Sequence, residues 1–391
     1  MSKNQFNPES NQQDQRGCIY IEVPKLFYTG GDDIEGTLHI SLTKEFKGSF
    51  LAINLQGIEE TSFTDVTKQS RKQGSKQSNT NPFTGSNVFL NLTIPLYDFS
   101  NGDKTNEFTL KPGNWSIPFK LNTATELPSS INFKNDEENY CFIKYTLNAY
   151  IFPTNLYDQP IQGSQEICLR QSSLLTDDEF LENEYERSPR QCCFKTGSYT
   201  LQANINAVNF IGGETIQLVL QGDFTKFTSK VNYIDVSLDG RLCIKSKTPQ
   251  QIKKYFNLYS IQYEVKVENK SCKQTININI PKNSPSSIQS ELIELQFSVN
   301  AKAITNTCFV EHSDPLYFNI QINSNEDYND HLVNEIQLPQ NWKPEVLQRQ
   351  VFDSQQAINF QKISIQFFQQ DQSSIKNQKT MEEPKMNNPQ L

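Results

Sequence analysis

Strict alternation of apolar and polar side chains is the feature that most constrains the fold of this chain. The longest alternating run places Val88, Leu90, Leu92, Ile94 and Leu96 at every second position. This period matches a β-strand, in which successive side chains point to opposite faces, so we expect all five on one buried face. Shorter runs of the same kind lie at 19–23, 38–42, 51–55, 117–121 and 145–151.

Turn-forming pairs separate these runs, namely Gly30-Gly31, Asn101-Gly102 and Pro112-Gly113. Short strands that each bury one face and are joined by turns are typical of a β-sandwich. The first half of the chain is therefore predicted to form one such sandwich.

The alternation stops after Ile167 and begins again at Tyr199. The intervening segment Thr176–Gln191 is acidic, lacks alternation and contains Pro189, which indicates a connector. Further runs lie at 199–205, 216–220, 234–238, 276–280, 293–299 and 318–322, and the chain is polar from about residue 325. We predict a disordered segment at 1–16, a sandwich at 17–175, a linker at 176–191, a second sandwich at 192–324 and a largely disordered tail at 325–391, in which 363–368 could form a strand on a partner.

Two segments of the chain echo each other. Val23–Leu42 and Asn206–Gly222 each contain a strand, an aromatic residue, a Gly-Gly pair, an acidic residue and another strand, in that order. Paired glycines allow a turn where a Cβ atom would clash. We therefore expect both sandwiches to begin with the same kind of β corner.

Composition limits the classes of partner and compartment. The 36 basic and 44 acidic side chains give a formal net charge of −8, so no attraction to nucleic acid is expected. The first residues have no apolar core and no run of 18 apolar residues occurs, so we expect neither a secretory signal nor a membrane span. The eight cysteines form no C-x-x-C pair, which favours a cytosolic protein without a disulfide framework.

The residue types that catalysis needs are not grouped. His39, His312 and His331 lie far apart, and His39, between Leu38 and Ile40 on a predicted strand, is expected to face solvent. The glycine pairs precede strands rather than helices, so they do not form a phosphate cradle. G-x-S-x-G, H-E-x-x-H and Walker motifs are lacking. We predict a protein that is not an enzyme and that holds no metal or cofactor.

Five segments in a fixed order carry a family signature. They read "LFYTGGDDIEGTLHISL", "FLAINLQGIEET", "GNWSIPFKLNTATELPSSI", "CFIKYTLNAYI" and "CCFKTGSYTLQANINAVNFIGGETIQL". Together they resemble the arrestin superfamily, most closely the α-arrestins (arrestin domain-containing proteins). The family's Gly…Pro-Phe…Leu-Pro-x-Ser signature is matched by Gly113, Pro118, Phe119, Leu127, Pro128 and Ser130. The resemblance implies an all-β fold of two tandem arrestin-like, immunoglobulin-like sandwiches with a disordered C-terminal tail.

The resemblance also implies a function. We expect a non-enzymatic adaptor in membrane-protein trafficking and endocytosis, which bridges the cytoplasmic tails of membrane cargo to coat or ubiquitin-ligase components. Such a protein would be cytoplasmic, with peripheral association to the plasma membrane or endosomes. A Vps26-like subunit of a retromer-type endosomal coat is the alternative. The family's Pro-Pro-x-Tyr motif, which recruits ubiquitin ligases, is lacking in this sequence, and direct recruitment is therefore in doubt.

The loop Thr61–Asn87 is longer than a hairpin requires, and loops of this length are often functional or disordered. It contains Asn81-Pro82-Phe83, which resembles the NPF tripeptide that EH domains read. An ordinary loop turn is the alternative interpretation.

Two basic segments and a cysteine pair are candidate membrane contacts. Each cation near an anionic leaflet contributes about 1 kcal/mol, although scattered solvated charge is the other interpretation. Cys192-Cys193 is interpreted as a sequence feature that is typical of the family at the start of its second domain. Palmitoylation is the alternative. A metal site is disfavoured because no further ligands stand at suitable spacing. The basic residues are Lys68, Arg71, Lys72, Lys76, Lys245, Lys247, Lys253 and Lys254.

Overall fold

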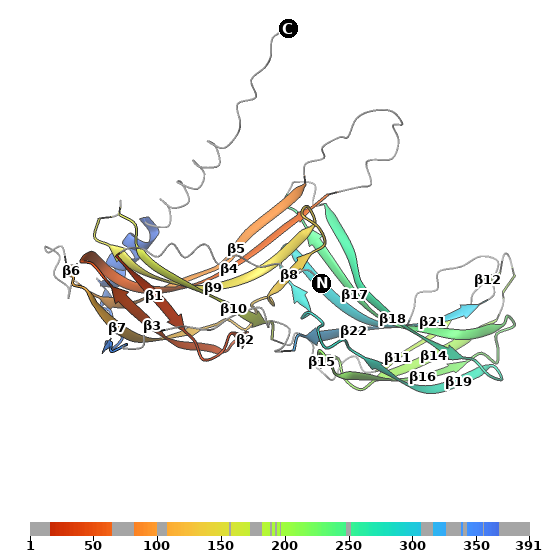
Figure 1. The fold of residues 1–391 in the computed structure, drawn as a ribbon. Helices are drawn as coiled ribbons and strands as arrows, with labels where there is room; N and C mark the ends of the chain where they lie inside the picture. The colour runs from red at the N-terminus through yellow and green to blue at the C-terminus, as the bar shows by residue number, and fades with distance from the viewer. Residues whose placement is uncertain are drawn as a thin grey trace, which may run out of the picture.

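The alternating runs form β-sheets that pack face to face, and two such sandwiches lie end to end (Figure 1). This confirms the predicted all-β fold of two tandem sandwiches. The structure is a computed structural model. It describes residues 16–64, 82–99, 108–155, 158–172, 182–187, 190–191, 194–195, 197–247, 252–305, 316–325, 338, 342–354 and 356–366.

The first sandwich pairs a sheet in the order β1-β3-β7-β23 with a larger sheet in the order β2-β10-β9-β4-β5; β6 is attached to β4 and β8 to β9. The strands are β1 (Gly17–Glu22), β2 (Phe27–Thr29), β3 (Asp33–Leu42), β4 (Phe46–Phe63), β5 (Phe83–Asp98), β6 (Thr109–Leu110), β7 (Gly113–Asn122), β8 (Ile131–Lys134), β9 (Tyr140–Pro153), β10 (Ile161–Arg170) and, near the other end of the chain, β23 (Glu345–Val346).

The second sandwich repeats this plan with sheets in the orders β11-β14-β16-β19 and β15-β22-β21-β17-β18, and with β20 attached to β21. A small hairpin of β12 and β13 precedes β14. The strands are β11 (Glu182–Arg187), β12 (Arg190–Gln191), β13 (Phe194–Lys195), β14 (Tyr199–Ile205), β15 (Asn209–Ile211), β16 (Thr215–Asp223), β17 (Val231–Lys245), β18 (Lys253–Lys266), β19 (Ser271–Asn279), β20 (Ile288–Gln289), β21 (Ile293–Thr305) and β22 (Leu316–Asn323).

Part of the predicted linker belongs to the second sandwich. β11 lies within the segment 176–191 and pairs with β14 along its whole length, from Glu182 opposite Asn204 to Arg187 opposite Tyr199. The strand is polar and lies at the edge of its sheet, so it lacks the apolar alternation that marks the other strands. An edge strand that is held mainly by main-chain hydrogen bonds does not need alternating apolar residues, so the sequence pattern does not reveal it.

The expected β corner occurs at the start of both sandwiches. Gly31 and Gly213 have φ angles of 93° and 97°, which favour glycine because an L side chain is strained there. Each corner is closed by the acidic residue that follows. Asp32 N donates to Thr29 O at 2.9 Å, and the Asp32 carboxylate accepts from Thr29 N at 2.9 Å. Glu214 closes the second corner on Ile211 in the same way.

The alternation predicted that the run from Val88 to Leu96 lies on one face of its strand. The structure shows that it does not. Leu90, Leu92 and Ile94 face inward opposite Gly57, Leu55 and Ile53, but the register with β4 shifts beyond Gly57 and again at Leu51. Val88 is consequently turned outward and is 52% exposed. A bulge adds one residue to one strand, so every side chain beyond it changes face.

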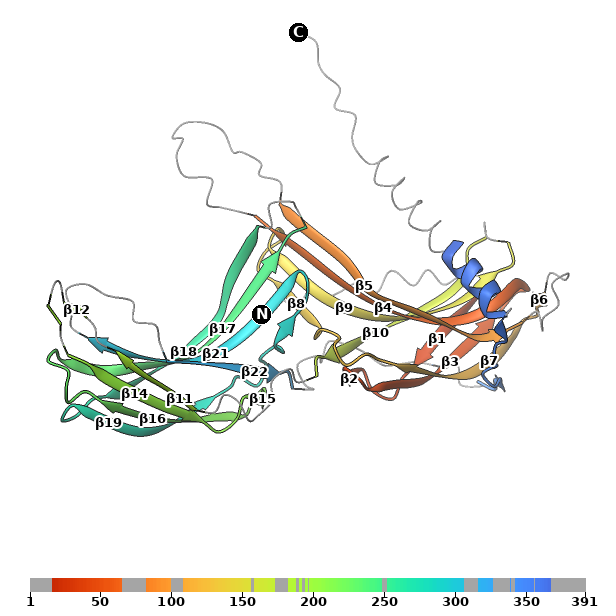
Figure 2. The same ribbon diagram turned by 180° about the vertical axis from the view of Figure 1, so that it is seen from behind.

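A C-terminal segment of 342–354 and 356–366, called here the strap, folds back onto the first sandwich (Figure 2). β23 pairs parallel with β7, placing Glu345 opposite Trp115. Further along, Gln350 N donates to Leu96 O of β5 at 3.0 Å. The strap therefore crosses the open side of the sandwich, within a region that the sequence predicts to be largely disordered.

The strap ends in a helix formed by residues 354 and 356–366, and this helix includes part of the candidate strand at 363–368. A capping box begins it: Gln356 N donates to Asp353 Oδ1 at 2.8 Å, and Asp353 N donates to Gln356 Oε1 at 3.1 Å. Phe360 is 4% exposed and packs against Phe50 and Phe152 on the outer face of the larger sheet, with ring centroids 5.7 Å and 6.1 Å away.

Candidate functional site

The joint between the two sandwiches is built on a buried carboxylate. Glu59 on β4 is 1% exposed. Its Oε2 accepts hydrogen bonds from Ser290 Oγ at 2.7 Å and Leu292 N at 3.1 Å, both in the second sandwich, and its Oε1 accepts from Asn87 Nδ2 at 3.0 Å. A buried carboxylate requires such donors because it has lost its hydration. Glu59 thereby ties β4 to the turn that leads into β21.

The ends of the long hairpins add further bonds across the joint. Thr61 Oγ1 donates to Lys245 O at 2.6 Å. Lys254 Nζ donates to Thr64 O at 3.2 Å and also to Asn139 Oδ1. Figure 1 shows the β4–β5 and β17–β18 hairpins rising side by side where the two sandwiches meet. The joint therefore holds two extended hairpins in a fixed relation.

Two similar loops complete the joint, "LPSSI" (127–131) and "SPSSI" (284–288). In the first, Ser130 exchanges bonds with Leu169: its N–H donates to Leu169 O at 2.7 Å, and its hydroxyl accepts from Leu169 N at 3.0 Å. In the second, Ser287 makes the same two bonds to Ile322, at 2.6 Å and 3.0 Å. Ser129 Oγ donates to Ser287 O at 3.2 Å and so joins the loops.

His39 is buried, contrary to the prediction that it faces solvent. It is 7% exposed and lies edge-on to Trp342 of the strap, with ring centroids 6.0 Å apart. Its Nε2 lies 2.7 Å from Glu22 Oε2, and its Nδ1 lies 2.8 Å from Ser116 Oγ. The strand does turn His39 away from the core of the sandwich, but the strap covers that outer face.

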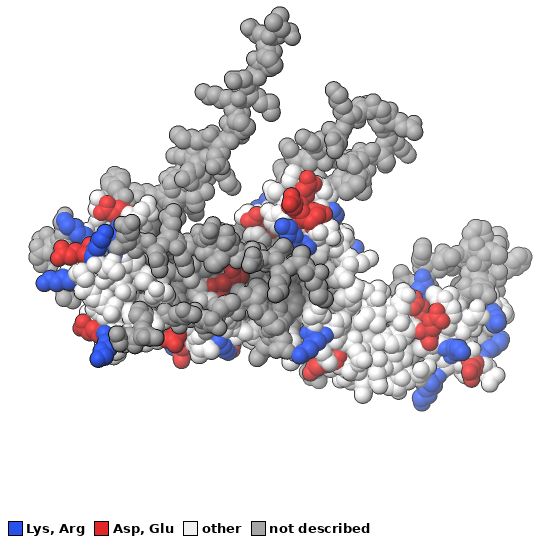
Figure 3. Space-filling model, in the orientation of Figure 1, with Lys and Arg blue, Asp and Glu red and all other residues white. Residues whose placement is uncertain are grey.

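The described residues contain no group of three or more His, Cys, Asp or Glu side chains placed to hold a metal ion. Nor does the described part of the chain include a helix with the length and apolar content that a bilayer crossing requires. In the view of Figure 3, basic and acidic side chains are interspersed in small groups over the described surface.

The predicted basic contacts near the joint are engaged with other groups. Lys245 Nζ lies 3.5 Å from Glu294 and Lys247 Nζ lies 3.7 Å from Glu291, while Lys254 makes the bonds described above. Lys253 is exposed at the start of β18. Lys68, Arg71, Lys72, Lys76, Cys192 and Cys193 lie outside the described residues.

The NPF tripeptide is described only in part. Asn81 lies outside the described residues, and Pro82 is exposed. Phe83 begins β5, is half-buried and packs against Phe63, with ring centroids 5.7 Å apart. For an EH domain to bind Phe83, the ring of this residue would have to leave its contact with Phe63.

The outer edge of β5 is open. β5 pairs with β4 on one side, and the described strands include none on its other side. Along this edge Leu90 and Ile94 are half-buried and Leu92 is 37% exposed, although all three face inward. An edge strand with unpaired main-chain groups and accessible apolar side chains can accept an added strand.

Two family models cover most of the chain, in the order of the two sandwiches. The arrestin (or S-antigen) N-terminal domain matches residues 18–169, and the arrestin (or S-antigen) C-terminal domain matches residues 195–326. The chain belongs to the arrestin superfamily. Proteins of this superfamily are in general non-enzymatic adaptors. A search of curated proteins gave no match.

The region matched by the arrestin N-terminal domain contains two buried cysteines that should be inert. Burial raises the pKa of the Cys141 thiol to about 12; burial, followed by the nearby Glu166 carboxylate, raises the pKa of Cys168 to about 12. Since the thiolate is the reactive form, iodoacetamide at pH 8 should leave both unmodified in the folded protein and modify both in urea. Peptide mass spectrometry measures this, with half-exposed Cys18 as the internal comparison. Equal rates at Cys141 and Cys18 would contradict the expectation.

Sequence reasoning did not assign a role to Glu59 or to the strap. Glu59 lies near the end of the segment "FLAINLQGIEET" (Phe50–Thr61). There the inward-facing residues change from apolar Leu55 to Gly57, Glu59 and Thr61. The change from apolar to polar inward residues marks the point at which β4 leaves its own core and meets the second sandwich. For the strap, the available signal was the capping-box sequence Asp353–Gln356.

Proposed function

We propose that this protein is an α-arrestin-like adaptor in membrane-protein trafficking, which binds the cytoplasmic tails of membrane cargo and brings them to sorting or ubiquitination machinery. In this proposal it works in the cytoplasm, at the plasma membrane or at endosomes. Its action depends on holding binding surfaces in a fixed arrangement rather than on chemistry.

The open edge of β5 is the observation that carries the proposal. A cargo segment in extended form would pair with the main chain of β5 and cover Leu90, Leu92 and Ile94. The strap already makes one bond of this kind, because Gln350 N donates to Leu96 O at the end of the same edge. The joint at Glu59 would keep this edge fixed relative to the second sandwich while a second partner binds there.

Proximity labelling of the full-length protein in cells tests this function. Leu92→Lys should remove at least half of the labelled membrane proteins, because an inward-pointing lysine on an edge strand, among the apolar side chains that the cargo would cover, opposes strand addition. Val88→Lys is the matched control, since Val88 lies on the same strand with its side chain turned outward and 52% exposed, and it should leave the labelling unchanged. Labelling without membrane proteins would contradict the proposal, and dominant labelling of a large helical-solenoid coat protein would favour the Vps26-like alternative.

The finer contacts remain part of the same proposal. Binding of EH domains through Asn81-Pro82-Phe83, contact of the basic residues with anionic lipid and palmitoylation at Cys192-Cys193 would each add attachment to the membrane. Replacing residues 65–81 with a short Gly-Ser linker removes four of the basic residues and Asn81 while preserving β4 and β5. The same labelling experiment would then show whether this loop contributes.

A further inference from the structure

The two sandwiches differ at one pair of matching positions. Gly57 of β4 lies opposite Tyr145 of β9, and the ring of Phe89 on β5 packs on that tyrosine with centroids 5.6 Å apart. At the same place in the second sandwich, Gly240 of β17 lies opposite Phe297 of β21 and Tyr259 of β18. Both sandwiches therefore have an aromatic pair at this place. The tyrosine of the pair lies on the central strand β9 in the first sandwich and on the edge strand β18 in the second.

This exchange leaves a polar group without a partner. In the first sandwich, Tyr145 Oη donates to Pro128 O at 2.7 Å. In the second, Tyr259 Oη is buried and has no hydrogen-bond partner among the described residues. Burial raises the pKa of Tyr259 to about 12, against the opposite effect of the neighbouring Ser284 hydroxyl, so the phenol stays protonated at physiological pH.

A second unpartnered hydroxyl lies beside it. Ser284 begins the "SPSSI" loop at the position that Leu127 holds in "LPSSI". Ser284 is 1% exposed, and its Oγ has no hydrogen-bond partner among the described residues. The two hydroxyls lie close enough to interact with each other, although neither makes a hydrogen bond of good geometry. A buried hydroxyl whose hydrogen bonding is incomplete costs about 1–3 kcal/mol.

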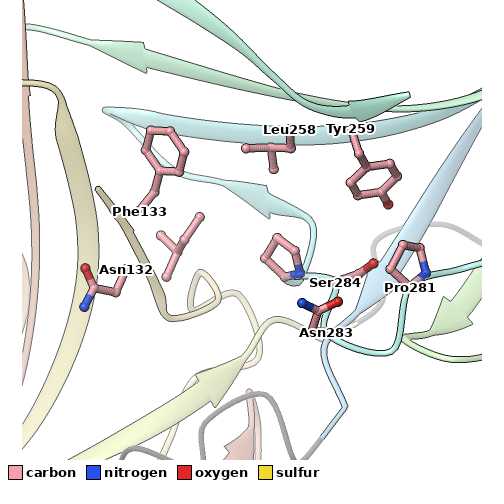
Figure 4. Close-up of a pocket in the computed structure, with 9 residues that line it drawn as sticks. Asn132, Phe133, Leu258, Tyr259, Pro281, Asn283 and Ser284 are labelled. Atoms are coloured by element: carbon pink, nitrogen blue, oxygen red, sulfur yellow. The ribbon is translucent and has the colours of Figure 1, made fainter. Parts of the chain in front are cut away.

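Tyr259 and Ser284 both line a pocket at the joint (Figure 4), with a volume of about 250 Å³, and their hydroxyl oxygens are buried in its wall. β8 of the first sandwich provides Ile131, Asn132 and Phe133, whereas the rest of the lining belongs to the second sandwich. In Figure 4 Tyr259 points from β18 toward the loop that carries Pro281 and Ser284. The remaining lining residues are Leu258, Asn283 and Pro285.

The backbone is shaped to form this pocket. The register of β18 on β17 shifts between Gly240 and Arg241, which pair with Tyr259 and Asn257, so Leu258 is the extra residue of a β-bulge. A bulge breaks the alternation of faces and redirects side chains. As a result, two consecutive residues, Leu258 and Tyr259, both line the pocket.

The lining defines the class of ligand. Ile131, Phe133, Leu258 and the two prolines offer an apolar wall, and no charged side chain lines the pocket. The two hydroxyls can each donate and accept one hydrogen bond. We propose that this pocket binds a small uncharged molecule that has an aromatic or branched apolar body and one hydroxyl or carbonyl group directed to Tyr259 and Ser284. Because its walls come from both sandwiches, the ligand would also strengthen the joint.

The probe for this site is 4-methylphenol, which has an apolar ring and one neutral hydroxyl. Titration into the full-length protein, followed by methyl NMR of Ile131 and Leu258, should give saturable shifts with a Kd on the order of 1 mM, as expected for a ligand of this size. Toluene, which lacks the hydroxyl, and 4-methylbenzoate, which is charged, should each bind at least five times more weakly.

Variants separate this site from unspecific binding. Tyr259→Phe and Ser284→Ala should each weaken 4-methylphenol binding about five- to tenfold, the usual effect of one lost hydrogen bond. Tyr255→Phe is the matched control, since Tyr255 lies on the same strand, is 51% exposed and does not line the pocket. Ser284→Leu, which copies Leu127, should fill the pocket and abolish binding.

Three results would each overturn the proposal: no saturable shift at ten times the expected Kd, equal binding of toluene and 4-methylphenol, or unchanged binding in both Tyr259→Phe and Ser284→Ala. If Ser284→Leu does not fold, the two smaller substitutions still decide the question. The result is independent of cargo binding, because neither the probe nor these residues involve the β5 edge.

Discussion

Glu59→Ala should lower the free energy of unfolding by about 2–4 kcal/mol and should allow the two sandwiches to unfold separately. Asn87 keeps a second acceptor in Glu291, and Ser290 Oγ can still donate to Ile293 O. Leu292 N, however, is buried and loses its acceptor, and such an orphaned donor costs about 1–3 kcal/mol. Loss of the packed side chain adds a cavity term.

The measurement exploits the placement of the two tryptophans. Trp115 lies on β7 and Trp342 in the strap, so tryptophan fluorescence reports the first sandwich alone. Far-UV circular dichroism reports both sandwiches. In urea the two signals should change together for the natural protein and at different concentrations for Glu59→Ala, because coincident probes indicate one cooperative unit.

Two further variants test the cause. Glu59→Gln keeps an acceptor oxygen at the same place and should lose only about 1 kcal/mol. Glu60→Ala is the matched control, since Glu60 lies on the opposite face of β4 and, within the described part of the chain, accepts from Tyr140 Oη of the first sandwich. A Glu60→Ala protein whose probes separate as widely as those of Glu59→Ala would refute the assigned role of Glu59.

Phe360→Ala should release the strap from the first sandwich. Removal of a buried phenylalanine side chain costs about 3–5 kcal/mol, which is large compared with the contacts that hold one short helix and a two-residue strand. Trp342 would then leave its place against His39 and enter water. Its fluorescence should shift to longer wavelength, and trypsin should cleave at Arg349 and Lys362 much faster than in the natural protein.

Ile358→Ala is the control for this prediction, because Ile358 lies on the same helix and is 45% exposed. It should leave both the emission spectrum and the cleavage rate unchanged. A strap that resists trypsin equally in the natural protein and in Phe360→Ala would show that Phe360 does not hold it.

The sequence contains enough information for the two sandwiches because alternation reports burial directly. On β9 the inward residues from Cys141 to Ile151 occupy every second position, and each is at most 2% exposed. The glycine corners could likewise be predicted, since a left-handed backbone and an acidic closing residue are local requirements. In both cases the cause lies within a few residues of the pattern.

Features that depend on distant residues could not be predicted in this way. The bulges that turn Val88 outward and bring Leu258 into the pocket depend on pairing with β4 and β17. The burial of His39 depends on Trp342, which lies about 300 residues later in the chain. Besides the capping box, the sequence contains one local sign of the strap. On β4, the unbroken apolar run of Phe50, Leu51, Ala52 and Ile53 departs from alternation, and all four are buried because both faces of the strand are covered there.

The strap also determines when the first sandwich can be completed during translation. All of its strands except β23 have been made once Arg170 is added, whereas the ring that covers Phe50 and Phe152 belongs to Phe360. At 5–20 residues per second the ribosome needs roughly 10–40 s for that interval. Nascent chains would therefore carry a bare aromatic surface throughout the synthesis of the second half, and that surface is where a chaperone would be expected to bind.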